Sequence, residues 1–194
     1  MDRVDTRGAL LDHATRLVRT RGYCAFSYAD LAVELGIRKA SVHHHFATKE
    51  HLGVELVSRY TERFQARLAD IDELATGPVD ALARYAALYR EGLTDGEACL
   101  CGVLAAEIAA VPPTIAAGVA EFFRLNRLWL ATVIDNGGLA RTPRQDPDDL
   151  AATLLATLEG AVLVARAHND VAVFDRVAAT AITVLATDRG PLPA

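Results

Sequence analysis

The sequence predicts an all-α protein, and three features of its 194 residues indicate that class. Alanine and leucine occur throughout the chain, and apolar residues recur at spacings of three and four. Runs of β-branched or aromatic residues as long as a strand are few. Glycine and proline fall between the periodic segments, where they end helices. A hydrophobic content of 52% is ample for a buried core, so we expect one or two folded domains.

The first two helices are predicted from their end signals. One helix is expected over Thr6–Arg21, because apolar side chains line one face of this segment and Gly22 follows it. Ser27 is a good N-cap, and Asp30 can complete a capping box with it. A second helix therefore starts at about residue 28 and ends at Gly36, the residue type best able to adopt the left-handed conformation.

A third, short helix follows this glycine turn. Val42, His45 and Phe46 recur at helical spacing and mark its inner face. Its outer face offers a cation, small residues and imidazoles, which can approach base edges and phosphates in the major groove of DNA. Thr48 caps the next helix, where free amides and Lys49 favour a phosphate. The expected DNA contacts are Ser27, Tyr28, Arg38, Lys39, Ala40, Ser41, His43, His44, Thr48 and Lys49. On spacing alone, an ordinary helical hairpin is the alternative.

The residue types in this segment are more specific than their spacing. The chain reads GIRKASVHHHFATKEHL from Gly36, after RTRGYCAFSYADLA from Arg19, and closely resembles the DNA-binding domain of the TetR family of bacterial transcriptional regulators. The residues that match the family pattern are Gly36, Ile37, Ser41, Val42, Phe46, Thr48, Lys49 and Glu50. The family's usual tyrosine is His43 here, so the hydroxyl that commonly contacts a phosphate is missing.

This resemblance implies a two-domain organisation. A three-helix helix-turn-helix domain, residues 1–47, is expected to continue through one long helix into a helical ligand-binding and dimerisation domain, residues 48–194, with about nine helices in all. The later helices are expected over 49–73, 78–92, 99–110, 114–136, 148–168 and 171–187. Asp146 is predicted to cap the helix that has Pro147 at its first position.

The last two helices indicate self-association. The segment LAATLLATLEGAVLVARA is apolar on more than one face, whereas a helix at a monomer surface should show one apolar stripe. The resemblance implies that the last two helices form a four-helix bundle across a two-fold axis. The expected interface residues are Leu155, Gly160, Val162, Leu163, Arg166, Val173 and Phe174. A helix buried within one chain is the alternative. A symmetric pair of short reading helices demands a palindromic operator.

A small-molecule effector site is expected in the larger domain. Bulky side chains and charged groups within apolar helices supply candidates, although for any single residue a core role is the better interpretation. The candidate residues are Tyr85, Tyr89, Cys101, Leu104, Glu107, Ile108, Phe122, Trp129, Leu155 and Glu159. With three cysteines in the chain, we expect free thiols, and a thiol-reactive effector acting at Cys99 or Cys101 is an alternative.

Charge and missing motifs limit the function further. The chain carries −5 overall, but residues 1–60 hold nine Lys and Arg against seven Asp and Glu, which is compatible with local phosphate contacts. The longest apolar stretch, 150–165, is interrupted by Glu159, so no membrane span is expected, and the protein should be cytoplasmic. We expect no cofactor and no metal. A small helical enzyme and a DNA-independent helical interaction protein are the alternatives to a DNA-binding regulator.

Overall fold

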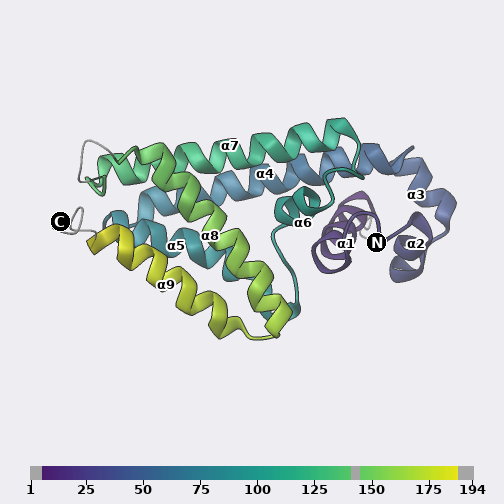
Figure 1. The fold of residues 1–194 in the computed structure, drawn as a ribbon. Helices are drawn as coiled ribbons and strands as arrows, with labels where there is room; N and C mark the ends of the chain where they lie inside the picture. Colours follow the sequence, from purple (N-terminus) through teal and green to yellow (C-terminus); the bar gives the residue numbers. More distant parts are fainter. Residues whose placement is uncertain (1–5, 141–144, 188–194) are drawn as a thin grey trace. The chain divides into compact units, whose positions relative to one another are not determined.

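The computed structural model describes residues 6–140 and 145–187, and within these ranges the chain forms α-helices, one short 3-10 helix and no strand (Figure 1). The helices are α1 (Thr6–Arg21), α2 (Tyr28–Leu35), α3 (Lys39–His45), α4 (Lys49–Leu74), α5 (Pro78–Arg90), η1 (Leu93–Asp95), α6 (Leu100–Ala106), α7 (Pro113–Asn136), α8 (Pro147–His168) and α9 (Val171–Thr187). The all-α prediction is confirmed.

Local end signals place the helices where the sequence predicts them. The Ser27 side chain accepts from the amide of Asp30, and the Asp30 carboxylate accepts from the Ser27 amide at 2.6 Å, which completes the capping box of α2. Gly36 ends α2 at φ 63° in the left-handed region. Asp146 caps α8 through the amide of Asp148, next to Pro147 at the first helical position.

In the middle of the chain one prediction is wrong and one element was not predicted. Helix α6 ends at Ala106 rather than at 110, because the next amides turn back to carbonyls three residues earlier, as from Ile108 to Ala105. The 3-10 helix η1 was not expected. It lies between Gly92 at φ 84° and Gly96 at φ 73°, two left-handed positions that only glycine adopts without strain.

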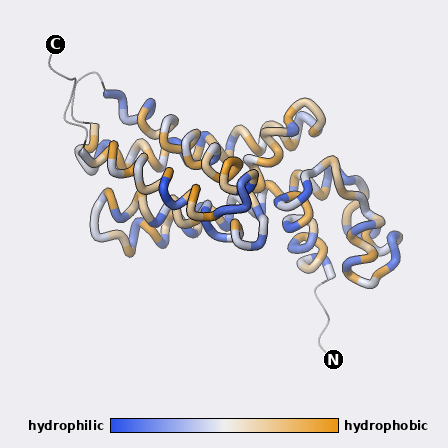
Figure 2. Tube along the Cα trace, turned by 60° about the horizontal axis from the view of Figure 1, so that its bottom comes forward, coloured by the Kyte–Doolittle hydropathy of each residue, from blue (hydrophilic) through white to orange (hydrophobic). Residues whose placement is uncertain are grey.

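The described chain divides into two compact units that are discontinuous in sequence. Unit 1 holds residues up to 63 together with 99–122, and unit 2 holds 64–98 together with 123 onward. The buried residues of α1, α2 and α3 form much of the unit 1 core, and α5, α8 and α9 pack together in unit 2. Figure 2 shows hydrophobic and hydrophilic residues mixed along these helices, as amphipathic packing requires. The functional boundary after residue 47 stays a prediction.

Helix α8 is the one candidate membrane span, by length and composition, among the described residues. At 22 residues and a mean hydropathy of 1.6 over its central window, it is long and apolar enough to cross a membrane, contrary to the sequence-based expectation. In the structure it begins with acidic residues in its first turn and packs on α9 and α5. Of its apolar window, 39% is buried within the described chain, so α8 packs against its neighbours and also leaves apolar side chains exposed.

Candidate nucleic-acid interface and effector domain

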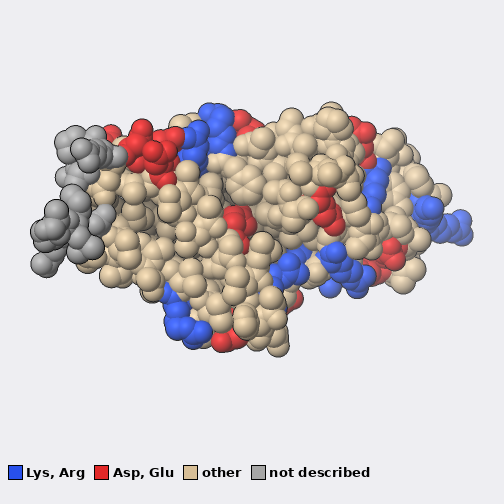
Figure 3. Space-filling view, in the orientation of Figure 1, with Lys and Arg blue, Asp and Glu red and all other residues tan. Residues whose placement is uncertain are grey.

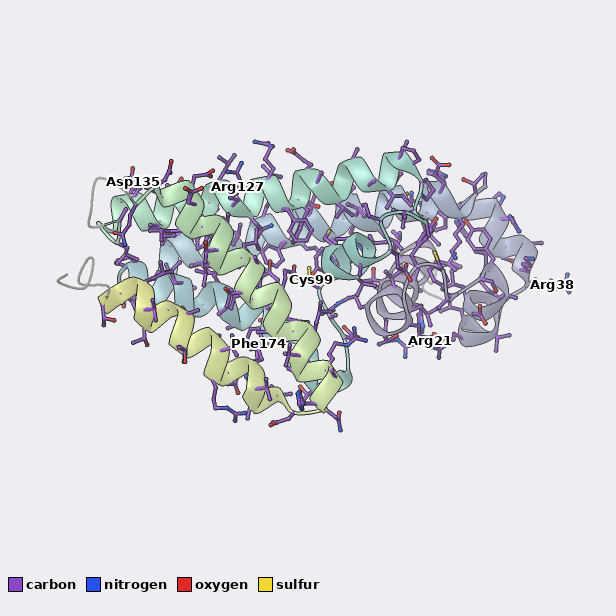
Figure 4. The ribbon with its side chains drawn as sticks, in the orientation of Figure 1. Arg21, Arg38, Cys99, Arg127, Asp135 and Phe174 are labelled. Atoms are coloured by element: carbon purple, nitrogen blue, oxygen red, sulfur yellow. The ribbon has the colours of Figure 1, made fainter. Side chains whose placement is uncertain are left out.

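Helix α3 has one buried face and one exposed face, as its periodicity predicts. Val42 and the following Phe46 are fully buried, and His45 is half-buried. The exposed side chains are Arg38, Lys39, Ala40, His43 and His44, with Ser41 at the margin. Arg38 extends outward from the start of α3 in Figure 4. The exposed face therefore presents two cations and two imidazoles beside small residues that allow close approach.

Arginine contacts hold the helices around α3 in place. Arg16 of α1 binds the Glu34 carboxylate of α2 at 2.7 Å. Arg7, at the other end of α1, binds Glu55 of α4 at 2.5 Å, and its guanidinium lies 5.2 Å from the centre of the Phe46 ring. The short helix α3 thus lies between helices that are tied to α1 on both sides.

At the start of α2 the expected DNA contacts are engaged within the protein. The Ser27 hydroxyl donates to Asp30 at 2.7 Å and serves the capping box. The Tyr28 hydroxyl is buried and has no hydrogen-bond partner among the described residues. Its ring packs edge-on against His43, with 4.8 Å between the ring centres, and burial raises its pKa to about 12. The prediction that Tyr28 contacts DNA is not supported, because its hydroxyl does not reach the surface.

The position of Lys49 also disagrees with the phosphate contact predicted from the sequence. Its ammonium group donates to the main-chain carbonyl groups of Tyr23 at 2.6 Å and Phe26 at 2.5 Å. It also lies 4.5 Å and 4.4 Å from the ring centres of the same two residues. Burial lowers the pKa of Lys49. A lysine held in this way fastens the start of α4 to the loop between α1 and α2, so its side chain does not extend toward a phosphate.

The N-terminus of α4 keeps its predicted cap. The Thr48 hydroxyl accepts from the amide of His51 at 3.0 Å, and Thr48 itself is exposed. Figure 3 shows lysine and arginine side chains at the surface around α2 and α3. Of the ten predicted contacts, Tyr28 is buried and Ser41 and Lys49 are half-exposed. The exposed ones are Ser27, Arg38, Lys39, Ala40, His43, His44 and Thr48.

The predicted effector residues are divided between the two units. Cys101, Leu104 and Phe122 are buried in the core of unit 1. Glu107, also in unit 1, accepts from the amide of Tyr23 at 2.8 Å, and Ile108 is 48% exposed. The remaining five, Tyr85, Tyr89, Trp129, Leu155 and Glu159, belong to unit 2. Sequence periodicity could not separate the two sets, because the assignment depends on tertiary packing.

The unit 2 candidates centre on an aromatic cluster. Tyr85 stacks on Trp129 with 5.4 Å between ring centres, and its hydroxyl lies 3.1 Å from that of Tyr89. The same hydroxyl donates at 3.0 Å to Asn126, a buried polar residue that the sequence analysis missed. A cavity of about 310 Å³ adjoins Trp129, whose indole nitrogen donates to Asp72 at 3.0 Å. This volume is at the lower end of the range for small-molecule sites.

The predicted dimer residues also divide by exposure. Leu155, Val162 and Phe174 are buried within the chain, and Phe174 is labelled on α9 in Figure 4. Leu163 is 51% exposed, and Gly160, Arg166 and Val173 are half-exposed. Val164 and Val184 add exposed aliphatic surface on α8 and α9 that was not predicted. In Figure 3 the surface over α8 and α9 carries only scattered charges.

The three cysteines are free thiols. Cys99 and Cys101 are buried, and only Cys24 is exposed. Burial raises the pKa of Tyr60, which lies beside Cys99, well above its ordinary value. The cysteines that were considered as sensors are thus shielded from solvent.

A short helix that presents basic residues, packed between two capped helices, defines a helix-turn-helix regulator. Comparison with known proteins agrees with this class. Residues 10–56 match the model of the bacterial regulatory proteins of the tetR family, and residues 78–180 match the C-terminal domain of LmrA/YxaF-like transcriptional regulators. The chain belongs to the TetR family of bacterial transcriptional regulators. Members of this family are regulators, and the chain is not an enzyme.

Individual relatives match over most of their length. The chain is 27% identical over 169 residues to the HTH-type transcriptional repressor DhaR of Mycobacterium sp. (strain GP1), covering 84% of this chain and 83% of DhaR. A TetR-family regulator from Agrobacterium tumefaciens is 33% identical, with a TM-score of 0.85 over 91% of this chain and 95% of that one. A TetR regulator from Legionella pneumophila is 27% identical, with the same TM-score of 0.85 over 95% and 99%.

Proposed function

We propose that this regulator binds a palindromic DNA operator as a homodimer and represses transcription until a small molecule releases it. The observation that carries the proposal is the exposed face of α3, where the side chains of Arg38, Lys39, His43 and His44 are exposed while the opposite face is buried. In this arrangement the cations neutralise phosphates and the imidazoles reach base edges. Repression is supported by the similarity to a protein named a repressor.

Dimerisation is the second part of the proposal. Leu163, Val164 and Val184 are large aliphatic side chains left exposed on α8 and α9. A Cβ added at Gly160 would lie in open space, with no other part of the described chain within 4 Å apart from its own stretch of helix, so this helix surface is open to a close neighbour. We assign this face to a second copy, since two reading helices double the number of base contacts. A cytoplasmic location follows from binding to bacterial DNA.

The effector site is the third part. We place it in unit 2 at the cavity beside Trp129, because this cavity lies next to the buried polar cluster of Tyr85, Tyr89 and Asn126. Helices α4 and α7 contribute residues to both units and are the continuous elements through which binding could act on α3. The effector must bind the DNA-free form more tightly than the DNA-bound form. A thiol-reactive effector would meet Cys24 first, since Cys99 and Cys101 are buried.

The DNA proposal is tested with intergenic DNA from beside the gene. An inverted repeat in this DNA should retard the purified protein on a gel, whereas a scrambled repeat should bind weakly and only at low salt. His44→Ala should relax the base preference, because it removes a side chain at the base edges. Arg84→Ala, an exposed arginine on α5, is the control and should bind like the parent. Equal binding of the parent to the repeat and to its scrambled form would refute the proposal.

The effector proposal has an internal reporter, since Trp129 is the only tryptophan in the sequence. A compound that releases the operator should change the Trp129 fluorescence at the same concentrations. Release of DNA without any change in fluorescence would place the effector elsewhere.

A further inference from the structure

The loop between α1 and α2, residues 22–26, is held by charged side chains from two other helices of unit 1. The amides of Tyr23 and Cys24 donate to one carboxylate oxygen of Glu107 at 2.8 Å and 3.2 Å. The carbonyl groups of Tyr23 and Phe26 accept from the Lys49 ammonium at 2.6 Å and 2.5 Å. The loop thus offers its donors to an anion after α6 and its acceptors to a cation at the start of α4.

Glu107 does not stabilise its own helix through its charge. It is the C-cap of α6, and its amide bonds back to the carbonyl groups of Val103 and Leu104. A negative charge is disfavoured at a helix C-terminus, where the last carbonyl groups already concentrate partial negative charge. Two loop amides compensate for this, since successive backbone N–H groups form a favourable site for a carboxylate. The side chain therefore serves the loop rather than α6.

The loop is shaped to admit this carboxylate. Gly22 has φ 102°, a conformation that side-chain-bearing residues rarely adopt. A Cβ at this position would lie 2.4 Å from one carboxylate oxygen of Glu107. A larger residue would be strained and would also push the carboxylate away from the amides. The backbone conformation at Gly22 and the absence of a side chain there thus leave room for the Glu107 carboxylate.

The loop controls two helix starts that frame α3. Phe26, whose carbonyl group accepts from Lys49, directly precedes Ser27, the N-cap of α2. Lys49 is the first residue of α4, which begins four residues after the end of α3. A displacement of the loop would therefore move the elements before and after α3 together.

We propose that Glu107 is a positioning residue for DNA reading: by holding the amides of Tyr23 and Cys24, it couples the end of α6 to the orientation of α3. This inference rests on the proposed DNA binding. The opposite charges of Glu107 and Lys49 stabilise the same loop, and the Glu107 carboxylate also favours the charged form of Lys49.

The test compares Glu107→Ala and Glu107→Gln with Glu73→Gln, an exposed carboxylate of α4 in unit 2. Removing a negative charge from a DNA-binding protein should by itself strengthen binding, and Glu73→Gln measures that effect. We expect the opposite for Glu107→Ala, a loss of about ten-fold in operator affinity, because it removes hydrogen bonds to a charged group. Glu107→Gln keeps an acceptor oxygen and should fall between the parent and Glu107→Ala.

Three further readouts separate positioning from a general loss of folding. Amide hydrogen exchange should accelerate at Tyr23 and Cys24 in Glu107→Ala, while the buried amides of α8 keep their protection. Cys24 is the exposed thiol, so the rate at which a thiol reagent labels it should also change in Glu107→Ala. The affinity of Glu107→Ala for scrambled DNA should not fall.

The outcomes are distinguishable. If the parent binds no operator, the proposed function fails and this inference falls with it. If the parent binds and both Glu107 variants bind as Glu73→Gln does, the positioning role alone is refuted. If Glu107→Ala is too unstable to measure, Glu107→Gln decides, and unchanged exchange at Tyr23 together with the affinity of Glu73→Gln refutes the inference.

Discussion

The loop 22–26 in unit 1 and the α8–α9 face in unit 2 are stabilised by different interactions. The loop is fixed by directional hydrogen bonds from Lys49 and Glu107 to backbone groups. The α8–α9 face is aliphatic, and Leu163 and Val184 remain exposed on it. Directional bonds fix the orientation of neighbouring helices, which base reading requires, whereas an apolar face gives non-directional affinity, which suits contact with a second chain.

The largest expected effect lies in unit 2. Leu163→Glu places a charge at the centre of the proposed dimer face and should raise the dimer dissociation constant by about 30-fold to 1,000-fold, as loss of a central interface residue does. Sedimentation measures this. Leu74→Glu, at an exposed leucine near the end of α4, should leave the dimer intact. If Leu163→Glu remained a dimer at low concentration, the α8–α9 face would not be the interface.

The next effect lies in the loop. Gly22→Ala should destabilise the protein by about 1–3 kcal/mol, because it strains the backbone and displaces Glu107. Gly36→Ala is the matched control. Gly36 has φ 63°, and an added Cβ would meet no atom of the described residues within 4 Å, so this variant should lose only the free energy needed to hold alanine in the left-handed conformation. Denaturant unfolding gives both values. Gly22→Ala should cost less in Glu107→Ala than in the parent, and an equal cost in both would show that the two residues are independent.

Alkaline pH should lower the stability of unit 1. Burial raises the pKa of Tyr23 and of Tyr28 to about 12 from the ordinary value of 10.0. Because the folded state keeps these phenols protonated, their contribution to stability is complete below pH 10 and is lost as the pH rises from 10 to 12. Phenolate absorbance should therefore appear together with loss of helical signal. Titration of all tyrosines at pH 10 without unfolding would contradict this.

The smallest expected effect is on the salt dependence of operator binding, which should differ between variants of Lys39 and Lys49. Lys39 is exposed on α3, so Lys39→Ala should flatten the salt dependence of operator binding by about 0.9 units of slope, as expected for one phosphate contact. Lys49→Ala should weaken operator binding while leaving the slope unchanged, because its ammonium is bound to carbonyl groups. Titrations at several salt concentrations measure both slopes. A flatter slope for Lys49→Ala would restore the phosphate contact predicted from the sequence.

The sequence predicted those features that depend on neighbouring residues. The Ser27 and Asp30 capping box, the left-handed Gly36 and the Asp146 cap each involve residues within a few positions of one another. The split of the histidines into a half-buried His45 and an exposed His43 and His44 follows from helical periodicity alone.

Features that depend on tertiary packing were missed. Glu107 and Tyr23 are 84 positions apart, and no local pattern indicates that the carboxylate binds loop amides. Glu107 was therefore assigned to an effector pocket, and Lys49 to a phosphate. The fold places the free end of a charged side chain, so the sequence located helix α3 but not the residues that hold it.

The number of chains on the operator tests the division of roles between the two units most directly. Mass measurement of the complex should find two chains on a duplex with both half-sites, and scrambling one half-site should weaken binding by at least about 100-fold, because half of the base contacts are lost. One chain per duplex, or equal affinity for the duplex with a single half-site, would contradict the account.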